Sequence, residues 1–318
     1  MSYSTEMSSL SMPIRFAGKA ENDGLIKRNF YCRVQPDLDI FIRNVTRTSA
    51  SNNVRLWLLH GAGMDSAGFD LPIEGWSLME SLARRGYDVF ALDYRGHGLS
   101  SRVLDGKSVD ISTVVDDCSH VIEMVEDAFG GGSLHLIGES FGSILAPLLA
   151  KRLGDSISSV TLLGPIFGSL GSIESDFLSS LPEFEGAPGG YAFTTEEEWG
   201  DLFFGSVDPK VLRWHQLWFG TAYAYPVGPY LALRNLPVDR DLNAINCPTL
   251  AVMGSLDPFA SEGSIQEMFG LMGSDATRLF IQDGIGHLPY VEERASEVID
   301  AICDLVDSTR ATGGGRQM

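Results

Sequence analysis

The sequence is short of cysteine, of basic residues and of long apolar runs. Its four cysteines lie far apart and form no Cys-x-x-Cys pair, so we interpret them as free thiols in a reducing compartment. No stretch reaches ~18 apolar residues, the minimum for a membrane-spanning helix. The first residues, MSYSTEMSSLSMPIRFAGKA, lack the basic segment and apolar core of a signal peptide. The sequence therefore predicts a cytoplasmic protein without integral membrane association.

Basic residues are strongly outnumbered, with 23 Lys and Arg against 42 Asp and Glu and a net charge of −19. Such an acidic chain is a poor binder of phosphate backbones, so we expect no nucleic-acid partner. No cluster of His, Cys or Asp has metal-ligand spacing, and no Gly-rich phosphate-binding motif occurs. The 318 residues, 44% of them hydrophobic, are enough for a folded core without disulfides or metals. The oligomeric state is left open.

Short apolar runs alternate with amphipathic segments along most of the chain. Continuous apolar strands followed by such segments are typical of an α/β fold, with a mostly parallel, doubly wound sheet covered by helices on both faces. The first two strands form a hairpin. Strands are predicted at 29–35, 38–45, 54–60, 87–94, 133–138, 158–164, 247–254 and 277–282, and helices at 76–86, 109–129, 143–154 and 289–308.

One connection is too long for a single crossover helix. The predicted strands ending at Gly164 and starting at Cys247 are separated by 247 − 164 − 1 = 82 residues, which are rich in aromatic side chains. We therefore predict that this segment contains an inserted helical lid. The predicted organisation is an N-terminal extension at 1–28, a core at 29–165 and 241–308, the lid at 166–240 and a disordered tail at 309–318.

The segment Gly138-Glu139-Ser140-Phe141-Gly142 stands where a predicted strand meets a predicted helix. The pattern Gly-x-Ser-x-Gly is a weak signal alone, but this context is the one that a nucleophile elbow requires. The sharp turn presents Ser140 at the carboxyl end of the strand. The N–H groups at the start of the helix favour negative charge there. Ser140 is therefore the candidate nucleophile, and we give Glu139 no role.

A serine hydroxyl needs a histidine base, and the base needs an orienting acid. His287 lies in a Gly-rich loop after the last predicted strand, on the edge where the strand ends converge. Asp257 follows the preceding strand and is the candidate acid, with Asp283 as the rival. We interpret the other histidines as structural: His60, His97, His120, His135 and His215.

The chain order Ser140, Asp257, His287 and the turns around these residues resemble the α/β-hydrolase superfamily, in its serine-nucleophile branch with a lid, over about residues 29–308. LLHGAGMD (58–65) is similar to the oxyanion loop of monoacylglycerol lipases. The resemblance implies that the backbone N–H groups of Ala62 and Phe141 form the oxyanion hole. DYRGHGLSSR (93–102) resembles the family's turn after the fourth strand. The resemblance implies that Asp93, Arg95 and His97 form a hydrogen-bonded corner rather than a catalytic cluster.

These residues predict an enzyme that hydrolyses an uncharged, fairly apolar, small-molecule carboxylic ester through an acyl-enzyme, with no cofactor. We expect Trp199, Trp214 and Trp218 of the lid to contact the substrate. The triad does not distinguish an ester from a thioester, amide, lactone or carbon–carbon bond, nor hydrolysis from acyl transfer to an alcohol. A ligand receptor on a hydrolase scaffold is a further alternative.

Overall fold

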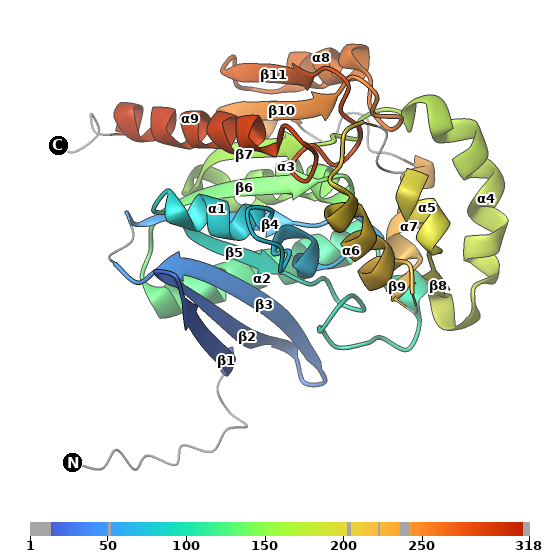
Figure 1. The fold of residues 1–318 in the computed structure, drawn as a ribbon, viewed down its shortest axis with the longest axis horizontal. Helices are drawn as coiled ribbons and strands as arrows, with labels where there is room; N and C mark the ends of the chain where they lie inside the picture. The colour runs from blue at the N-terminus through green and yellow to red at the C-terminus, as the bar shows by residue number, and fades with distance from the viewer. Residues whose placement is uncertain (1–13, 50–51, 202–204, 222, 236–241, 314–318) are drawn as a thin grey trace.

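A computed structural model of the protein describes residues 14–49, 52–201, 205–221, 223–235 and 242–313 (Figure 1). Its centre is one nine-stranded sheet in the order β1-β2-β3-β5-β4-β6-β7-β10-β11. The pairs β1–β2, β2–β3 and β3–β5 are antiparallel, and the remaining pairs are parallel. The strands are β1 (Ile14–Asn22), β2 (Leu25–Gln35), β3 (Leu38–Arg47), β4 (Val54–Leu59), β5 (Asp88–Leu92), β6 (Ser133–Glu139), β7 (Ile157–Leu163), β10 (Thr249–Gly254) and β11 (Thr277–Gln282).

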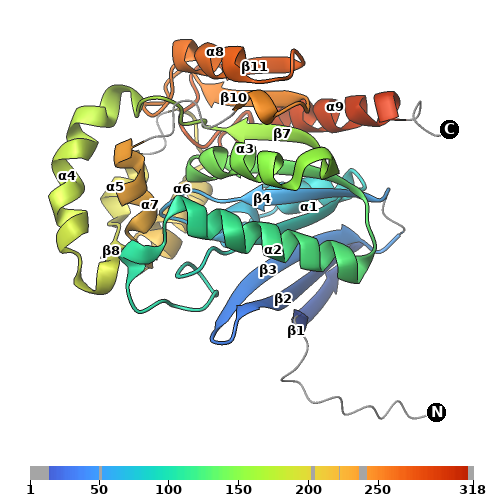
Figure 2. The same cartoon turned by 180° about the vertical axis from the view of Figure 1, so that it is seen from behind.

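Helices cover both faces of the sheet, as seen in the two opposite views of Figures 1 and 2. Helices α1 and α9 pack on one face, and α2, α3 and α8 pack on the other. The predicted α/β architecture with a mostly parallel sheet is thereby confirmed. The helices are α1 (Leu78–Arg84), α2 (Ile111–Phe129), α3 (Phe141–Leu153), α8 (Glu262–Leu271) and α9 (Ala295–Gly313).

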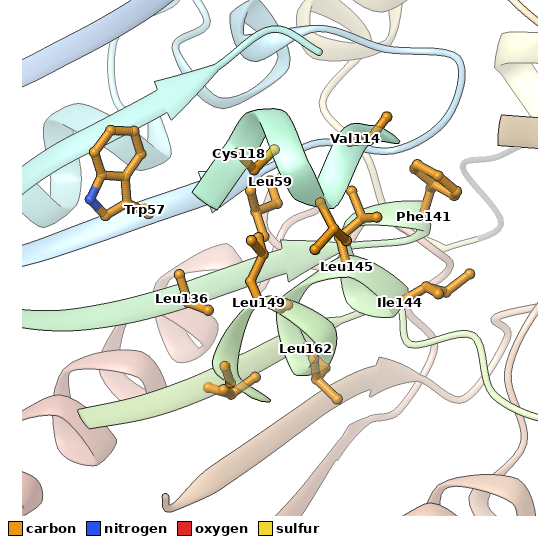
Figure 3. Packing of buried hydrophobic residues seen from close by; sticks show 14 of the residues in the cluster. Trp57, Leu59, Val114, Cys118, Leu136, Phe141, Ile144, Leu145, Leu149 and Leu162 are labelled. Atoms are coloured by element: carbon orange, nitrogen blue, oxygen red, sulfur yellow. The ribbon is translucent and has the colours of Figure 1, made fainter. Parts of the chain in front are cut away.

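The larger of the two apolar layers holds β4, β6 and β7 against α2 and α3 (Figure 3). Helix α2 presents one apolar stripe to the strands, while α3 is apolar on nearly every side and lies deep in the layer. A helix that is apolar all round is expected only where it is buried on most sides. The labelled side chains come from the strands (Trp57, Leu59, Leu136, Leu162) and from the helices (Val114, Cys118, Phe141, Ile144, Leu145, Leu149).

The prediction of an extension at 1–28 is wrong for the described residues 14–28, which belong to the β1–β2 hairpin. The two strands are joined by Asp23 and Gly24, with φ values of 46° and 73°. Asp-Gly at such φ values is a typical two-residue hairpin turn. Strand β1 lies at the sheet edge and is mostly exposed, so it lacks the apolar alternation by which a strand is found in a sequence. Residues 1–13 lie outside the described part.

The structure differs from the sequence prediction at two further places toward the C-terminus. Helix α9 spans Ala295–Gly313 rather than 289–308, so the first residues of the predicted disordered tail are helical. Helix α8 was not predicted, because Gly263 and Gly270 lower the helix propensity of a short segment. Its N-terminus is fixed by Ser261, whose hydroxyl accepts a hydrogen bond from the Ser264 N–H at 3.2 Å.

The long connection between β7 and β10 lies beyond the carboxyl ends of the parallel strands (Figure 1). Its described part contains helices and also a small antiparallel sheet of β8 and β9, which the sequence did not indicate. The Tyr191 hydroxyl at the start of β8 bonds both backbone groups of Val103, which ties this insertion to the core. Its elements are α4 (Glu174–Gly186), β8 (Tyr191–Phe193), α5 (Glu196–Asp201), α6 (Pro209–Phe219), β9 (Ala224–Pro226) and α7 (Gly228–Ala232).

Candidate active site

Ser140 occupies a strained turn between β6 and α3. Its φ of 51° and ψ of −114° lie in a region that costs a non-glycine residue about 1–3 kcal/mol. The flanking glycines make the turn possible. A Cβ at Gly138 would lie 2.1 Å from the Gly142 carbonyl oxygen, and one at Gly142 would lie 2.0 Å from the Leu59 carbonyl oxygen. The turn therefore holds the Ser140 hydroxyl at the sheet edge, next to the N-terminus of α3.

The structure brings the three predicted residues Ser140, Asp257 and His287 together. The Ser140 Oγ lies 2.9 Å from His287 Nε2, and His287 Nδ1 lies 2.9 Å from Asp257 Oδ1. Asp257 Oδ1 also accepts the Phe259 N–H at 2.9 Å, and the Phe259 ring packs on the imidazole at 4.2 Å between centroids. The arrangement is a continuous chain of hydrogen bonds from a buried carboxylate to a serine hydroxyl.

The rival acid Asp283 lies elsewhere. Its side chain is exposed, and its Oδ1 accepts a hydrogen bond from the Ser255 hydroxyl at 3.2 Å. The other histidines also lie outside this chain of hydrogen bonds. His135 bonds two serine hydroxyls, His215 bonds the Val211 carbonyl and His120 is exposed on α2.

Three carboxyl groups act on the electrostatics of His287. Burial disfavours the imidazolium, but the charge and hydrogen bond of Asp257, with Glu139 and Glu292 adding to them, raise the pKa of His287 above its usual value. Burial raises the pKa of the Glu139 carboxyl to about 7, and burial likewise raises the pKa of Glu292 to about 7. The imidazole is therefore a stronger base than an isolated one.

His60 supports the loop that precedes Ala62. Its Nε2 accepts the Tyr94 N–H at 3.2 Å, so Nδ1 carries the proton and donates to the Gly61 carbonyl oxygen at 2.8 Å. Burial lowers the pKa of His60 to about 3, which keeps the ring neutral. Because the Gly61 C=O and the Ala62 N–H point in opposite directions within one peptide plane, holding the carbonyl also orients the amide.

The corner expected at Asp93, Arg95 and His97 has structural contacts only. Asp93 accepts the N–H groups of Ser66 and Leu99, at 2.8 and 2.7 Å. Arg95 forms a bidentate ion pair with Asp117 of α2. His97 Nε2 lies 2.9 Å from the Ala62 carbonyl oxygen, so this corner also holds the Ala62 loop.

A cavity of about 480 Å³ opens beside Ser140 and His287. Ala62 and Phe141, the residues whose amides were expected to bind an oxyanion, both line it. Most of its wall is apolar and comes from the insertion and the segment leading into it. Residues of this wall that the sequence did not single out include Ile166, Leu170, Phe177 and Phe184.

Of the three tryptophans expected to contact substrate, only Trp199 lines the cavity. Helix α6 turns Val211, His215 and Phe219 inward, which places Trp214 and Trp218 on a neighbouring face. These two rings stack on each other at 5.5 Å, and Trp218 is 46% exposed. For Trp214 and Trp218 the expectation was therefore wrong. The aromatic residues of the insertion do indicate an apolar cavity wall, but the sequence does not show which face of α6 points inward.

A family model described as "Alpha/beta hydrolase family" matches residues 58–301. The chain belongs to this family. The hydrolase is 32% identical over 98 residues to a Haemophilus influenzae protein named probable lysophospholipase L2, covering 30% of this chain and 31% of that one. It thus spans about a third of that relative. It is 26% identical over 277 residues to the AB hydrolase superfamily protein YisY of Bacillus subtilis, and the match covers 83% of this chain and 94% of that protein.

Solved structures share the fold. A hydrolase from Pseudomonas aeruginosa PA01 superimposes with a TM-score of 0.68 at 19% identity, covering 87% of this hydrolase and 98% of that chain. Within the described ranges, no group of three or more His, Cys, Asp or Glu side chains is placed to hold a metal ion. No helix there is both long and apolar enough to cross a bilayer.

Proposed function

We propose that this hydrolase cleaves uncharged, apolar carboxylic esters through an acyl-enzyme formed on Ser140. The observation that carries the proposal is the chain of hydrogen bonds from Asp257 through His287 to the Ser140 hydroxyl, at 2.9 Å each, in the wall of an apolar cavity. A base within this distance of a hydroxyl makes it a nucleophile.

In the first half-reaction, Ser140 Oγ attacks the ester carbonyl while His287 Nε2 takes its proton. The Asp257 carboxylate stabilises the resulting imidazolium, and the N–H groups of Ala62 and Phe141 stabilise the oxyanion. His287 then gives the proton to the leaving alcohol. A water molecule, deprotonated by His287, releases the acid and restores Ser140.

The charges around the cavity favour a neutral substrate. Carboxyl groups of Glu139, Asp176 and Glu198 line it, and among the described lining residues there is no Lys or Arg. An anionic acyl group would therefore enter against repulsion and without a partner for its charge. The apolar walls favour an acyl chain of medium length or an aromatic group over acetyl.

The same groups can also cleave a thioester, amide, lactone or carbon–carbon bond, or transfer the acyl group to an alcohol. A panel of such substrates, compared with esters of the same acyl group, separates these chemistries. We expect the ester to have the highest kcat/KM and the free acid to be the main product.

The proposal is tested by labelling the protein with a fluorophosphonate and by measuring a chain-length series of p-nitrophenyl esters. We expect one label on Ser140, none on the Ser140→Ala variant, and turnover that increases with chain length beyond acetyl. Absence of labelling, together with binding of an ester without turnover, would contradict the proposal and favour a ligand receptor.

A further inference from the structure

Glu139 is a carboxyl group beside the nucleophile that the triad does not use. Its side chain is almost completely buried, yet it lines the cavity. No hydrogen bond of normal geometry reaches its Oε2 from the described residues, although the Gly61 backbone N–H lies near enough to favour the charged carboxylate. A buried polar atom without a partner is costly and in native proteins usually has a water or a ligand to satisfy it. The other carboxyl oxygen, Oε1, is the one that faces the base.

The carboxyl lies between the base and the loop that carries Ala62. Its Oε1 is 4.0 Å from His287 Nε2, and a Cβ built at Gly61 would lie 2.7 Å from its Oε2. A separation of 4.0 Å is too long for a direct hydrogen bond. It is short enough for one water molecule to lie at about 2.8 Å from both atoms. His287 Nε2 is also the atom that must deprotonate water in the second half-reaction.

We propose that Glu139 positions the water molecule that hydrolyses the acyl-enzyme; this inference rests on the proposed esterase function. After the alcohol has left, the water donates one hydrogen bond to Glu139 and the other to His287 Nε2, with its lone pair toward the acyl carbon. Its oxygen bonds to that carbon as Nε2 takes the proton. The bond from carbon to Ser140 Oγ then breaks, Oγ keeps the electron pair and takes the proton from Nε2, and the acid leaves. Glu139 accepts a hydrogen bond throughout and exchanges no proton.

Glu292 provides a matched control. It is also a buried carboxyl whose charge acts on His287, and its Oε1 accepts the Gly286 N–H at 2.8 Å. Unlike Glu139, it is not among the residues that line the cavity. It can therefore alter the basicity of His287 but cannot hold a water molecule against the acyl group.

The experiment uses a p-nitrophenyl ester for which the full-length protein shows a pre-steady-state burst, so that kcat reports deacylation and kcat/KM reports acylation. Glu139→Met removes the acceptor at similar length. We expect its kcat to fall about tenfold or more while kcat/KM stays within about threefold. Glu139→Gln, whose amide oxygen still accepts from water, should keep kcat within about threefold of the wild type. Glu292→Gln should change kcat and kcat/KM by the same factor.

Added methanol gives a second readout, because methanol attacks through its single O–H to His287 and needs no second acceptor. The ratio of methyl ester to acid in the products should rise in Glu139→Met and stay at the wild-type value in Glu139→Gln and Glu292→Gln. An unchanged product ratio in Glu139→Met would overturn the inference. Equal losses in Glu139→Gln and Glu139→Met would also overturn it, because charge rather than water placement would then be the cause. If the wild type gave no burst and no label, the proposed function itself would fail.

Discussion

Replacing Asp257 by Asn separates the orienting effect of the acid from its charge. Asp257 Oδ1 accepts both the Phe259 N–H and the His287 Nδ1–H, whereas Oδ2 has no partner among the described residues. In an Asn side chain, the amide oxygen must take the Oδ1 position, since an NH2 group there would face two donors. The imidazole would then keep the same tautomer and lose only the neighbouring charge.

The size of the loss follows from that charge. Two unit charges at roughly 4 Å, with an effective dielectric constant near 20, interact by about 4 kcal/mol. At 1.36 kcal/mol per factor of ten, this is a loss in kcat/KM of about 10²–10³, since relaxation and water offset part of it. The loss is smaller than the ~10⁴ expected when the same substitution forces the wrong tautomer. The Asp257 charge also raises the pKa of His287, so the acid limb of the pH profile should move to lower pH.

The assay is the pH dependence of kcat/KM with the best p-nitrophenyl ester, measured for Asp257→Asn, Asp257→Ala and Asp283→Asn. Asp283 is exposed and bonded to Ser255, so its substitution should change kcat/KM by less than about twofold. A loss in Asp257→Asn as large as in Asp257→Ala would refute the argument that Phe259 fixes the amide. A loss below tenfold would refute the assignment of Asp257 as the orienting acid.

Other expected outcomes concern the nucleophile, the base and the cavity wall. Ser140→Ala should lose turnover to the level of residual catalysis without a covalent step, with an unchanged melting temperature and no fluorophosphonate label. For the wild type, kcat/KM should rise with pH through a group titrating above the ordinary histidine value of about 6.5, because His287 must lose its proton to act. Trp199→Ala should flatten the dependence of kcat/KM on acyl chain length, expected at about 0.8 kcal/mol per buried methylene, whereas Trp218→Ala should not.

The residues that could be found from the sequence are those whose place is fixed by the backbone. Ser140 follows an apolar strand and opens an apolar helix, so its exposure at the sheet edge follows from local pattern alone. His287 and Asp257 follow strands whose carboxyl ends share that edge, so their proximity follows from the parallel sheet. For these residues the expected placement and the structure agree.

Residues whose place depends on the orientation of an element could not be found in this way. Trp214, His215 and Trp218 are close in sequence on α6, and only packing decides which of them faces inward. The prediction missed strand β1 because that strand has almost no apolar pattern. It is held by backbone pairing to β2 and has little apolar burial, so its sequence carries no period.

Glu139, in the active site, is another residue whose position cannot be derived from the sequence. Its neighbour Ser140 is placed by the turn, but the end of the Glu139 side chain is placed by two other loops, one carrying Gly61 and the other carrying His287. No local sequence pattern predicts that these two loops come together at the Glu139 carboxyl, so the residue could not be given a role from the sequence. Burial disfavours the charged form of this carboxyl and raises its pKa to about 7. A water molecule bonded to Oε1 would offset part of that cost, and it would lie beside the base that must deprotonate it.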